Sequence, residues 1–235
     1  AENLPKNIDA IIHLAQSRAF REFPQKAKDI FEVNVTSTSR MLDYAYYASC
    51  KKFLFASTGS LYKSLDRFPT ETDSVLPYHE LGFYPASKLC GEILCLNYSN
   101  YFKVTILRYF SIYGSQQAKE MLIPRLVGKV SKENPVTLNG SAGIRINPIH
   151  VDDASMATME ALKRTGNEIF NIGGNQILSI KDICEIIGEQ VGKKPIYLVE
   201  GTGRPDVAGD ISKMNKYLHK PATSFKCGIR KMVNK

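Results

Sequence analysis

The sequence lacks any apolar run that could cross a membrane. No run approaches the roughly 20 apolar residues that a membrane-spanning helix needs. The first ten residues, AENLPKNIDA, have neither the basic start nor the apolar stretch of a signal peptide. We therefore expect a cytoplasmic protein without a membrane partner.

Paired cysteines and concentrated charge are also missing. The five cysteines form no C-x-x-C pair, and an odd number fits a reduced intracellular compartment better than a disulfide framework. The 31 Lys and Arg residues exceed the 23 Asp and Glu residues by 8. These charges are scattered along the chain and concentrate only in the tail over 213–235. That tail has no aromatic interleaving, helix-turn-helix pattern or zinc spacing, so no nucleic-acid partner is expected.

What the chain does have is a set of short apolar runs. Four of them are continuous rather than alternating, as in strands that a parallel sheet buries on both faces. They are 9–15 (DAIIHLA), 52–56 (KFLFA), 104–110 (VTILRYF) and 168–172 (EIFNI). Apolar residues at helical spacing separate the first three runs, over 30–49 and 84–102. This alternation of strand and helix predicts an α/β fold with crossover connections.

After residue 114 the pattern changes to shorter segments that proline and glycine interrupt. Helices are expected near 151–164 and 180–192, and Ser179 with Asp182 forms a capping-box pattern at the start of the second. These segments predict a smaller C-terminal lobe. In open α/β sheets, ligands bind outside the carboxyl ends of the strands. The residues that follow the strands are therefore the main candidates for the functional site. They are 15–17, 57–60 and 111–114.

Tyr84 and Lys88 lie four residues apart in the stretch YPASK, which places them on the same face of a helix. A phenol with a pKa near 10 is a poor base at neutral pH, but a fixed cation lowers that pKa by favouring the phenolate. The pair could then transfer a proton, with a hydroxyl from 57–60 holding a substrate oxygen. Taken alone, however, such a pair is more often a surface tyrosine and a solvated lysine.

Eight motifs follow one another in order along nearly the whole chain. They are IIHLAQ (11–16), NVTST (34–38), FLFASTGSLY (53–62), YPASK (84–88), LRYFSIYG (107–114), RINPIHVDD (145–153), FNIGG (170–174) and GRPDVAGDISK (203–213). Together they resemble the extended short-chain dehydrogenase/reductase family, specifically its NAD-dependent nucleotide-sugar epimerases and dehydratases. The resemblance implies a Rossmann-like, doubly wound parallel sheet and a smaller C-terminal α/β substrate lobe. The cofactor-binding part would span 1–115, with 145–175 returning to it, and the substrate lobe would span 116–235.

The resemblance also implies the site residues and their roles. Tyr84 would be the catalytic base, Lys88 would lower its pKa and bind the nicotinamide ribose of NAD, and Thr58 would steady the reacting sugar oxygen. Cofactor-binding positions are matched by Ala15, Asn34, Ser57, Tyr84 and Lys88. Substrate-binding positions are matched by Thr58, Ser111, Arg145 and Arg204. The two arginines would clamp the diphosphate of a nucleotide sugar, because guanidinium groups suit phosphate oxygens.

Histidine and carboxylate residues invite a metal-site interpretation, which the resemblance disfavours. His150, Asp152 and Asp153 carry ligating groups, but the matching stretch of the family begins a helix. We therefore expect one of the carboxylates to cap that helix, and no metal site. His13 lies inside an apolar run and is expected to be a core histidine.

The resemblance further implies a homodimer. In the family, the two long helices that correspond to 31–49 and 84–102 commonly build a four-helix dimer interface. Tyr44, Tyr46 and Tyr47 would then lie at the partner surface, although burial in the protein's own core is an equal alternative.

One feature of the family is missing from the sequence. The family begins with a strand, a turn of the G-x-x-G-x-x-G kind and a helix, whose backbone amides hold the cofactor's pyrophosphate. The run 9–15 corresponds to the family's fourth strand, so the first three strands are absent and this run becomes a bare sheet edge. We expect poor NAD affinity, and either a longer parent protein or a partner chain that covers the edge.

A second departure from the family's pattern bears on the type of reaction. Dehydratases of the family carry an Asp-Glu pair after the catalytic threonine, where this chain has Gly59 and Ser60. The predicted activity is therefore NAD-dependent epimerisation of a nucleotide sugar. Two alternatives stay open. One is an NADPH-dependent reductase of a keto sugar or other carbonyl, with NADP in place of NAD, and the other is a catalytically silent fragment that binds a nucleotide sugar.

Overall fold

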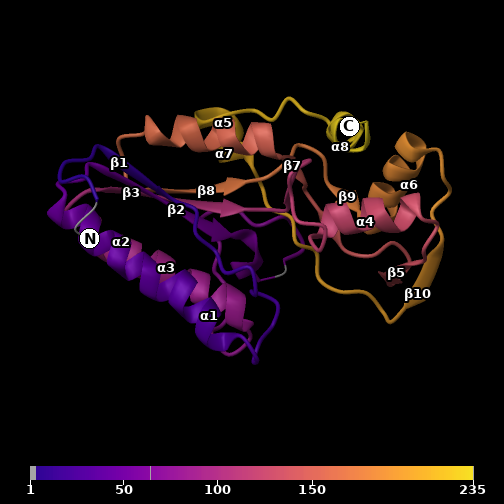
Figure 1. Ribbon diagram of the computed structural model, residues 1–235, viewed down its shortest axis with the longest axis horizontal. Helices are drawn as coiled ribbons and strands as arrows, with labels where there is room; N and C mark the ends of the chain where they lie inside the picture. Colours follow the sequence, from indigo (N-terminus) through magenta and orange to yellow (C-terminus); the bar gives the residue numbers. More distant parts are fainter. Residues whose placement is uncertain (1–3, 64, 235) are drawn as a thin grey trace. The chain divides into compact units, whose positions relative to one another are not determined.

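The four continuous apolar runs form one sheet in the computed structural model, which describes residues 4–63 and 65–234 (Figure 1). Its strands are β1 (Ala10–His13), β2 (Lys52–Thr58), β3 (Lys103–Tyr109) and β8 (Glu168–Ile172), in the order β1-β2-β3-β8. β2 pairs in parallel with both β1 and β3. Phe53, Leu54 and Phe55 are fully buried, because β2 is covered on both faces.

The predicted bare edge concerns β1. Within the described residues this strand lies at one end of the sheet and pairs with β2 alone. Leu14, which follows the strand, is 58% exposed.

The chain divides into two units, each with its own core. Among the described residues, unit 1 contains 4–63, 71–109 and 158–171, and unit 2 contains 65–70, 110–157 and 172–234. This division separates the chain after Tyr109 and assigns 158–171 to unit 1. α5 (Val151–Leu162) begins in unit 2 and ends in unit 1. The predicted division into 1–115 with 145–175, and 116–235, stays a prediction.

Two long helical segments cover one face of the sheet in unit 1 (Figure 1). The first runs without a break through α1 (Ala27–Phe31), a π-helical stretch (Glu32–Thr36) and α2 (Ser37–Tyr47). The second is α3 (Phe83–Asn97), which ends five residues before the predicted boundary at 102. Leu42 of α2 and Cys95 of α3 are fully buried in one cluster with Phe53 and Phe55.

The close approach of α3 to the sheet depends on a glycine. A Cβ atom added at Gly91 would lie 2.3 Å from the ring of Phe55, closer than packed atoms approach. Only glycine therefore fits at this position while Phe55 keeps its place.

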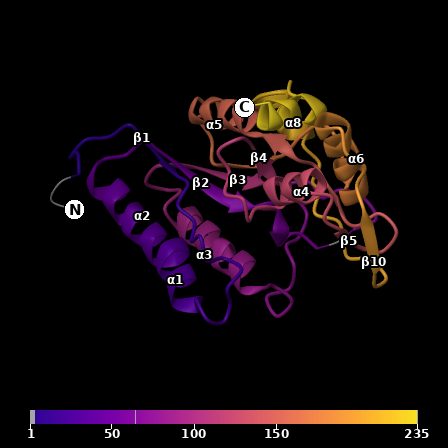
Figure 2. The same ribbon diagram turned by 45° about the vertical axis from the view of Figure 1, so that its right-hand side comes forward.

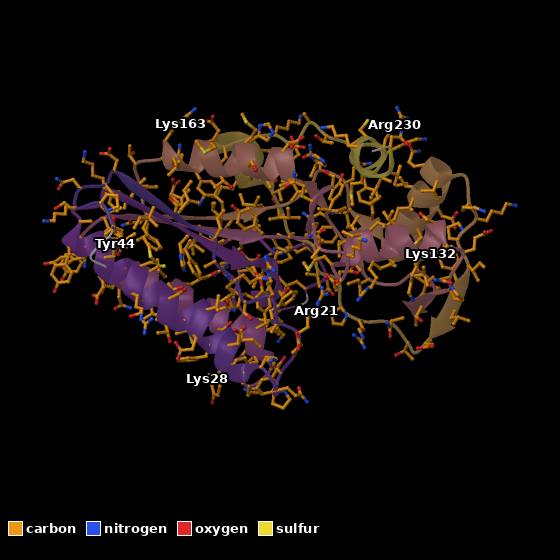
Figure 3. The ribbon with its side chains drawn as sticks, in the orientation of Figure 1. Arg21, Lys28, Tyr44, Lys132, Lys163 and Arg230 are labelled. Carbon is orange, nitrogen blue, oxygen red and sulfur yellow. The ribbon has the colours of Figure 1, made fainter. Side chains whose placement is uncertain are left out.

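The outer faces of these helices carry exposed aromatic residues. Tyr46 is 47% exposed and Tyr47 is 81% exposed, so the alternative that these two side chains are buried in the protein's own core is wrong. Tyr44, labelled in Figure 3, is half-buried, and its hydroxyl donates a hydrogen bond to the carbonyl of Pro5.

Unit 2 contains three small two-stranded pairings. β4 (Ile112–Tyr113) pairs with β7 (Ile149–His150), β5 (Val136–Asn139) pairs with β10 (Tyr197–Glu200), and β6 (Arg145–Ile146) pairs with β9 (Leu178–Ser179). The first two pairings are parallel and the third is antiparallel.

Helices α4 (Leu122–Ser131), α6 (Ile180–Val191), α7 (Ser212–Tyr217) and α8 (Phe225–Val233) complete unit 2, and α6 contacts both α4 and α8 (Figure 2). The predicted capping box is confirmed, since the Ser179 hydroxyl accepts from the backbone N–H of Asp182 and the Asp182 carboxylate accepts from that of Ser179. α6 ends at Gly192, which adopts a φ of 68°. Across the described residues, no helix has the length and apolar character to cross a membrane.

Candidate active site

Tyr84 lies in the first turn of α3, and its phenol reaches the carboxyl edge of the sheet. The phenol donates a hydrogen bond of 2.9 Å to Oε1 of Gln16, which follows β1. The side chain of Thr58, the last residue of β2, lies close enough to favour the phenolate of Tyr84. Tyr84 therefore meets the ends of two neighbouring parallel strands, where ligands bind in open α/β sheets.

Lys88 lies one turn further along α3 and is 1% exposed. Its ammonium donates to the carbonyl of Ala15 at 3.2 Å and to the carbonyl of Ala56 at 2.9 Å. Burial lowers the pKa of Lys88 to about 8, because the charged form loses its hydration. Lys88 thus ties α3 to β2 and to the segment after β1, on the same edge as Tyr84.

The prediction that Lys88 lowers the pKa of the phenol is wrong for this structure. Burial raises the pKa of Tyr84 to about 12, although Thr58 and Arg21 both favour the phenolate. The physical reason is that the Lys88 ammonium is directed at two backbone carbonyls rather than at the phenol oxygen. The nearby cation is Arg21 (labelled in Figure 3), whose guanidinium stacks 4.7 Å from the ring of Phe20.

Asn34 is 1% exposed and braces the site rather than facing solvent. Its amide nitrogen donates to the hydroxyl of Ser87 at 2.9 Å, and its amide oxygen accepts from the backbone N–H of Ser17 at 3.0 Å. Asn34 therefore links the segment after β1 to α3. Its side chain is engaged with the protein, so the predicted contact with a cofactor stays a prediction.

Ser57 is 4% exposed, and its hydroxyl donates to the carboxylate of Glu92. Arg108 donates to the same carboxylate through Nε at 2.9 Å and through Nη2 at 2.6 Å. Since the Ser57 hydroxyl donates its proton within this buried network, the predicted contact of Ser57 with a cofactor stays a prediction.

His13 is confirmed as a core histidine. It is 6% exposed, and its Nε2 lies 3.1 Å from the hydroxyl oxygen of Thr38. Burial lowers the pKa of His13 to about 4.

The two predicted phosphate-binding arginines lie in unit 2 and differ in their surroundings. Arg145 forms an ion pair with Asp206 at 2.7 Å, and its guanidinium lies 5.3 Å from the ring centre of Phe68. Arg204 lines a cavity of about 340 Å³ together with Arg125 and Lys129. Three cations therefore border one cavity, and only Arg204 among them was singled out from the sequence.

Ser111, the remaining predicted substrate residue, has a strained backbone. Its φ of 41° lies in the left-handed region, which a serine rarely adopts, and its carbonyl accepts from the backbone N–H of Ile149 at 3.3 Å. Such strain often accompanies functional positions, but the side-chain role of Ser111 stays a prediction.

The carboxylates at the start of α5 bind other protein groups. Asp153 accepts from His219 at 2.9 Å and from the backbone N–H groups of Ala222 and Thr223 at 3.0 Å. Asp152 pairs with Lys231 at 3.0 Å. Both lie inside the first turn of α5, and Asp153 anchors the segment before α8, so the expectation that it caps α5 is wrong. The described part of the chain holds no cluster of three or more ligating side chains that could bind a metal.

Sequence reasoning missed three residues that support the site. Gln16 was included only as part of the stretch after a strand, and nothing in its type marks it as a partner of Tyr84. Glu92 follows Lys88 by one turn of α3, so its position on the same helix face was a usable signal. Arg108 gave no signal, because its partner lies on another element.

Comparison with known proteins identifies the family. Residues 2–173 match the model of the NAD dependent epimerase/dehydratase family. The UDP-glucuronate 4-epimerase of Thermodesulfobacterium geofontis is 29% identical over 242 residues, covering 97% of this chain and 72% of that protein. The dTDP-D-glucose 4,6-dehydratase of Mus musculus is 29% identical over 192 residues, covering 78% of this chain and 53% of that protein.

Solved structures agree in fold. The UDP-glucuronic acid 4-epimerase of Bacillus cereus, in complex with UDP-glucuronic acid and NAD, superposes with a TM-score of 0.85 at 28% identity. That match covers 97% of this chain and 74% of the other. The Rossmann-like α/β fold expected from the motifs is thereby confirmed. The chain belongs to the NAD dependent epimerase/dehydratase family.

Proposed function

We propose that the chain epimerises a nucleotide sugar, with Tyr84 as the group that removes and returns the proton of the reacting hydroxyl. The observation that carries the proposal is the placement of Tyr84, Thr58 and Lys88 at the carboxyl ends of β1 and β2, where the phenol donates to Gln16 and the ammonium donates to Ala15 and Ala56. The family membership and the sugar-nucleotide 4-epimerases among its relatives support the same activity.

NAD is the cofactor of this family. When bound, NAD supplies the hydride acceptor and donor that the reaction requires. The donor set at the edge of the sheet suits its ribose. Two of the three N–H donors of Lys88 reach carbonyls of the described residues, which leaves a third for a ribose hydroxyl. Ala15 accepts from this lysine and Asn34 binds Ser17 and Ser87, so both residues would border the same ligand.

Tyr84 must become a better base than its raised pKa makes it. Its pKa of about 12 arises from burial, and Thr58 and Arg21 already act in the opposite direction by favouring the phenolate. Thr58 would also hold the sugar oxygen, since its hydroxyl lies within hydrogen-bonding reach of the phenol. The proton then moves between a sugar hydroxyl and a phenol that are held side by side.

The cavity of unit 2 suits the nucleotide end of such a substrate. Arg204, Arg125 and Lys129 supply positive charge for a diphosphate, and Thr137 and Asn139 add polar groups for a base or ribose. Arg145, which Asp206 already neutralises, is the weaker choice for a phosphate ligand.

Two residues next to Thr58 favour one reaction type over the other. Gly59 and Ser60 follow Thr58, where the dehydratases of the family carry an acidic pair. Without those carboxylates the chain has no group at these positions to protonate a leaving hydroxyl. Epimerisation is therefore favoured over dehydration, although both kinds of enzyme occur among the relatives.

A homodimer is part of the proposal. The outer faces of the two long helical segments expose large apolar side chains, which a four-helix contact between two copies would cover. Their exposed fractions are 49% for Phe31, 47% for Tyr46, 81% for Tyr47, 52% for Ile93 and 44% for Leu96, and Tyr101, just beyond α3, is 65% exposed. Sedimentation of the chain should then give twice the mass of one copy.

A turnover assay tests the proposed activity. The chain is incubated with either UDP-glucuronate or UDP-glucose and with saturating NAD, because its NAD affinity is expected to be poor, and the sugar is followed by NMR. Appearance of the epimer supports the proposal. A product that has lost water would identify a dehydratase, and reduction of a keto sugar with NADPH would identify a reductase. Binding of the sugar nucleotide without any turnover would identify a silent binding protein, and in each of these cases the proposal fails.

A matched pair of variants tests the nucleotide cavity. Arg204→Met should weaken UDP binding at least tenfold in calorimetry, because it removes a charged phosphate ligand. Lys132→Met changes an exposed lysine just beyond α4 (labelled in Figure 3) and should leave UDP affinity unchanged. Equal affinities of the two variants would reject the assignment of the cavity.

A further inference from the structure

The side chain of Gln16 faces the phenol of Tyr84. We propose that Gln16 is a positioning residue, whose amide oxygen accepts a hydrogen bond from the neutral form of Tyr84 and thereby favours that form over the phenolate. This inference rests on the proposed function, because it assigns Gln16 a part in the proton transfer of Tyr84. It is carried by the 2.9 Å hydrogen bond from the phenol to Oε1 of Gln16.

The residues directly before and after Gln16 are both anchored by hydrogen bonds. The carbonyl of Ala15 accepts from the ammonium of Lys88, and the backbone N–H of Ser17 donates to the buried amide oxygen of Asn34. The hydroxyl of Ser17 donates in turn to the carboxylate of Asp29. A residue between two anchored neighbours has little backbone freedom, so its side chain starts from a fixed point next to Tyr84.

The anchors of this segment come from the helix that carries Tyr84. Lys88 binds Ala15 directly, and Ser87 binds the Asn34 side chain that holds Ser17. α3 therefore positions the acceptor as well as the phenol. The contact is a built part of the site, and a freely moving surface glutamine would not be expected to lie at the same place.

The chemistry of the contact follows from the proton count. A neutral phenol has one proton to donate, and an amide oxygen accepts a hydrogen bond without taking the proton. While Tyr84 donates to Gln16, it is protonated and cannot remove a proton from a sugar. Removal of the amide oxygen should therefore favour the phenolate, and a negative charge at the same place should favour the neutral phenol.

Two variants of Gln16 should shift the pKa of Tyr84 in opposite directions. Gln16→Ala removes the acceptor, so the pKa of Tyr84 should fall by about half a unit to one unit, which corresponds to one neutral hydrogen bond. Gln16→Glu keeps the shape and adds a negative charge, so the pKa should rise. A merely structural role of Gln16 would move the pKa in the same direction in both variants, or in neither.

The test follows the Tyr84 phenol directly. The chain is labelled with ¹³C at Cζ of tyrosine, the Tyr84 signal is assigned by its loss in Tyr84→Phe, and the signal is titrated with base in the absence of NAD. Gln25→Ala, a change of an exposed glutamine in the same segment, serves as the control and should not move the signal. Opposite shifts for Gln16→Ala and Gln16→Glu support the proposal. Shifts of one sign, no shift, or a raised pKa in Gln16→Ala overturn it.

A second measurement separates this inference from the proposed function. The acidic limb of the pH profile of kcat/KM should move to lower pH in Gln16→Ala and to higher pH in Gln16→Glu. Opposite shifts in the titration without any turnover would leave the contact standing and reject the epimerase. Turnover with unchanged pH profiles and no shift in the titration would reject the role of Gln16 alone.

Discussion

Glu92 of α3 and Arg108 of β3 form a buried, two-pronged ion pair beneath the candidate site. The Glu92 and Arg108 side chains are 2% and 6% exposed, and the shorter of the two contacts is 2.6 Å. Ser57, next to Thr58, adds a third hydrogen bond to the carboxylate. The pair and Ser57 therefore fix α3, which carries Tyr84, against β2 and β3.

Breaking this pair should be costly. In Glu92→Gln the guanidinium of Arg108 stays buried without a countercharge, and the expected loss is about 3 to 5 kcal/mol in the free energy of unfolding. Urea denaturation measures it. The control is Glu160→Gln, since Glu160 pairs with Lys163 at the surface (Lys163 is labelled in Figure 3), and the expected loss there is below about 1 kcal/mol. Equal losses in the two variants would contradict the structural role of the pair.

Gly91 should tolerate no side chain. In Gly91→Ala the new methyl group meets the Phe55 ring, and overpacking of this kind costs about 1 to 3 kcal/mol. Gly128 lies in α4 with no atom within 4 Å of an added Cβ, so Gly128→Ala should instead stabilise by about 0.5 to 1 kcal/mol. Thermal unfolding of both variants checks the signs. A stabilised Gly91→Ala protein would show that α3 packs less closely on the sheet.

Lys88 should be needed for activity but not for stability. The buried ammonium is unfavourable, as its lowered pKa of about 8 shows, while its two hydrogen bonds to carbonyls act in the opposite direction. Because these contributions offset one another, Lys88→Met should unfold within about 1 kcal/mol of the parent protein and lose epimerase turnover. Lys132→Met is the control for both measurements. Full turnover in Lys88→Met would remove Lys88 from the site.

His13 should make the protein sensitive to acid. Its pKa is lowered from 6.5 to about 4 in the folded state, so below pH 6.5 the unfolded chain binds the proton more readily. The free energy of unfolding should therefore decrease as the pH falls from 6.5 to about 4, by up to about 3 kcal/mol. Urea denaturation across this range measures the slope. The slope should be shallower in His13→Gln, and an unchanged slope would show that other groups cause it.

Much of the fold could be predicted from local pattern. The four apolar runs became the strands of one sheet, and Ser179 with Asp182 formed the expected capping box, because both signals lie within a few residues of sequence. The ends of the helices were predicted less accurately. α3 ends at Asn97 rather than near 102, since apolar spacing continues past the last helical turn.

The site was predicted less completely, because its contacts join distant elements. The positions of Tyr84 and Lys88 followed from their spacing on one helix. The high pKa of the phenol did not, since it depends on burial and on the carbonyls of Ala15 and Ala56, which take the lysine ammonium. The contact of Gln16 with Tyr84 spans 68 residues of sequence and could not be inferred from residue type.

The most direct test of the account compares Tyr84→Phe with the parent protein in the turnover assay with NAD and a UDP-sugar. Removal of one hydroxyl keeps the ring and its packing, so affinity for the UDP-sugar should change less than about twofold, while turnover should fall by about 10² to 10⁴. Unaltered turnover in Tyr84→Phe would contradict the assignment of Tyr84 as the proton-transferring group.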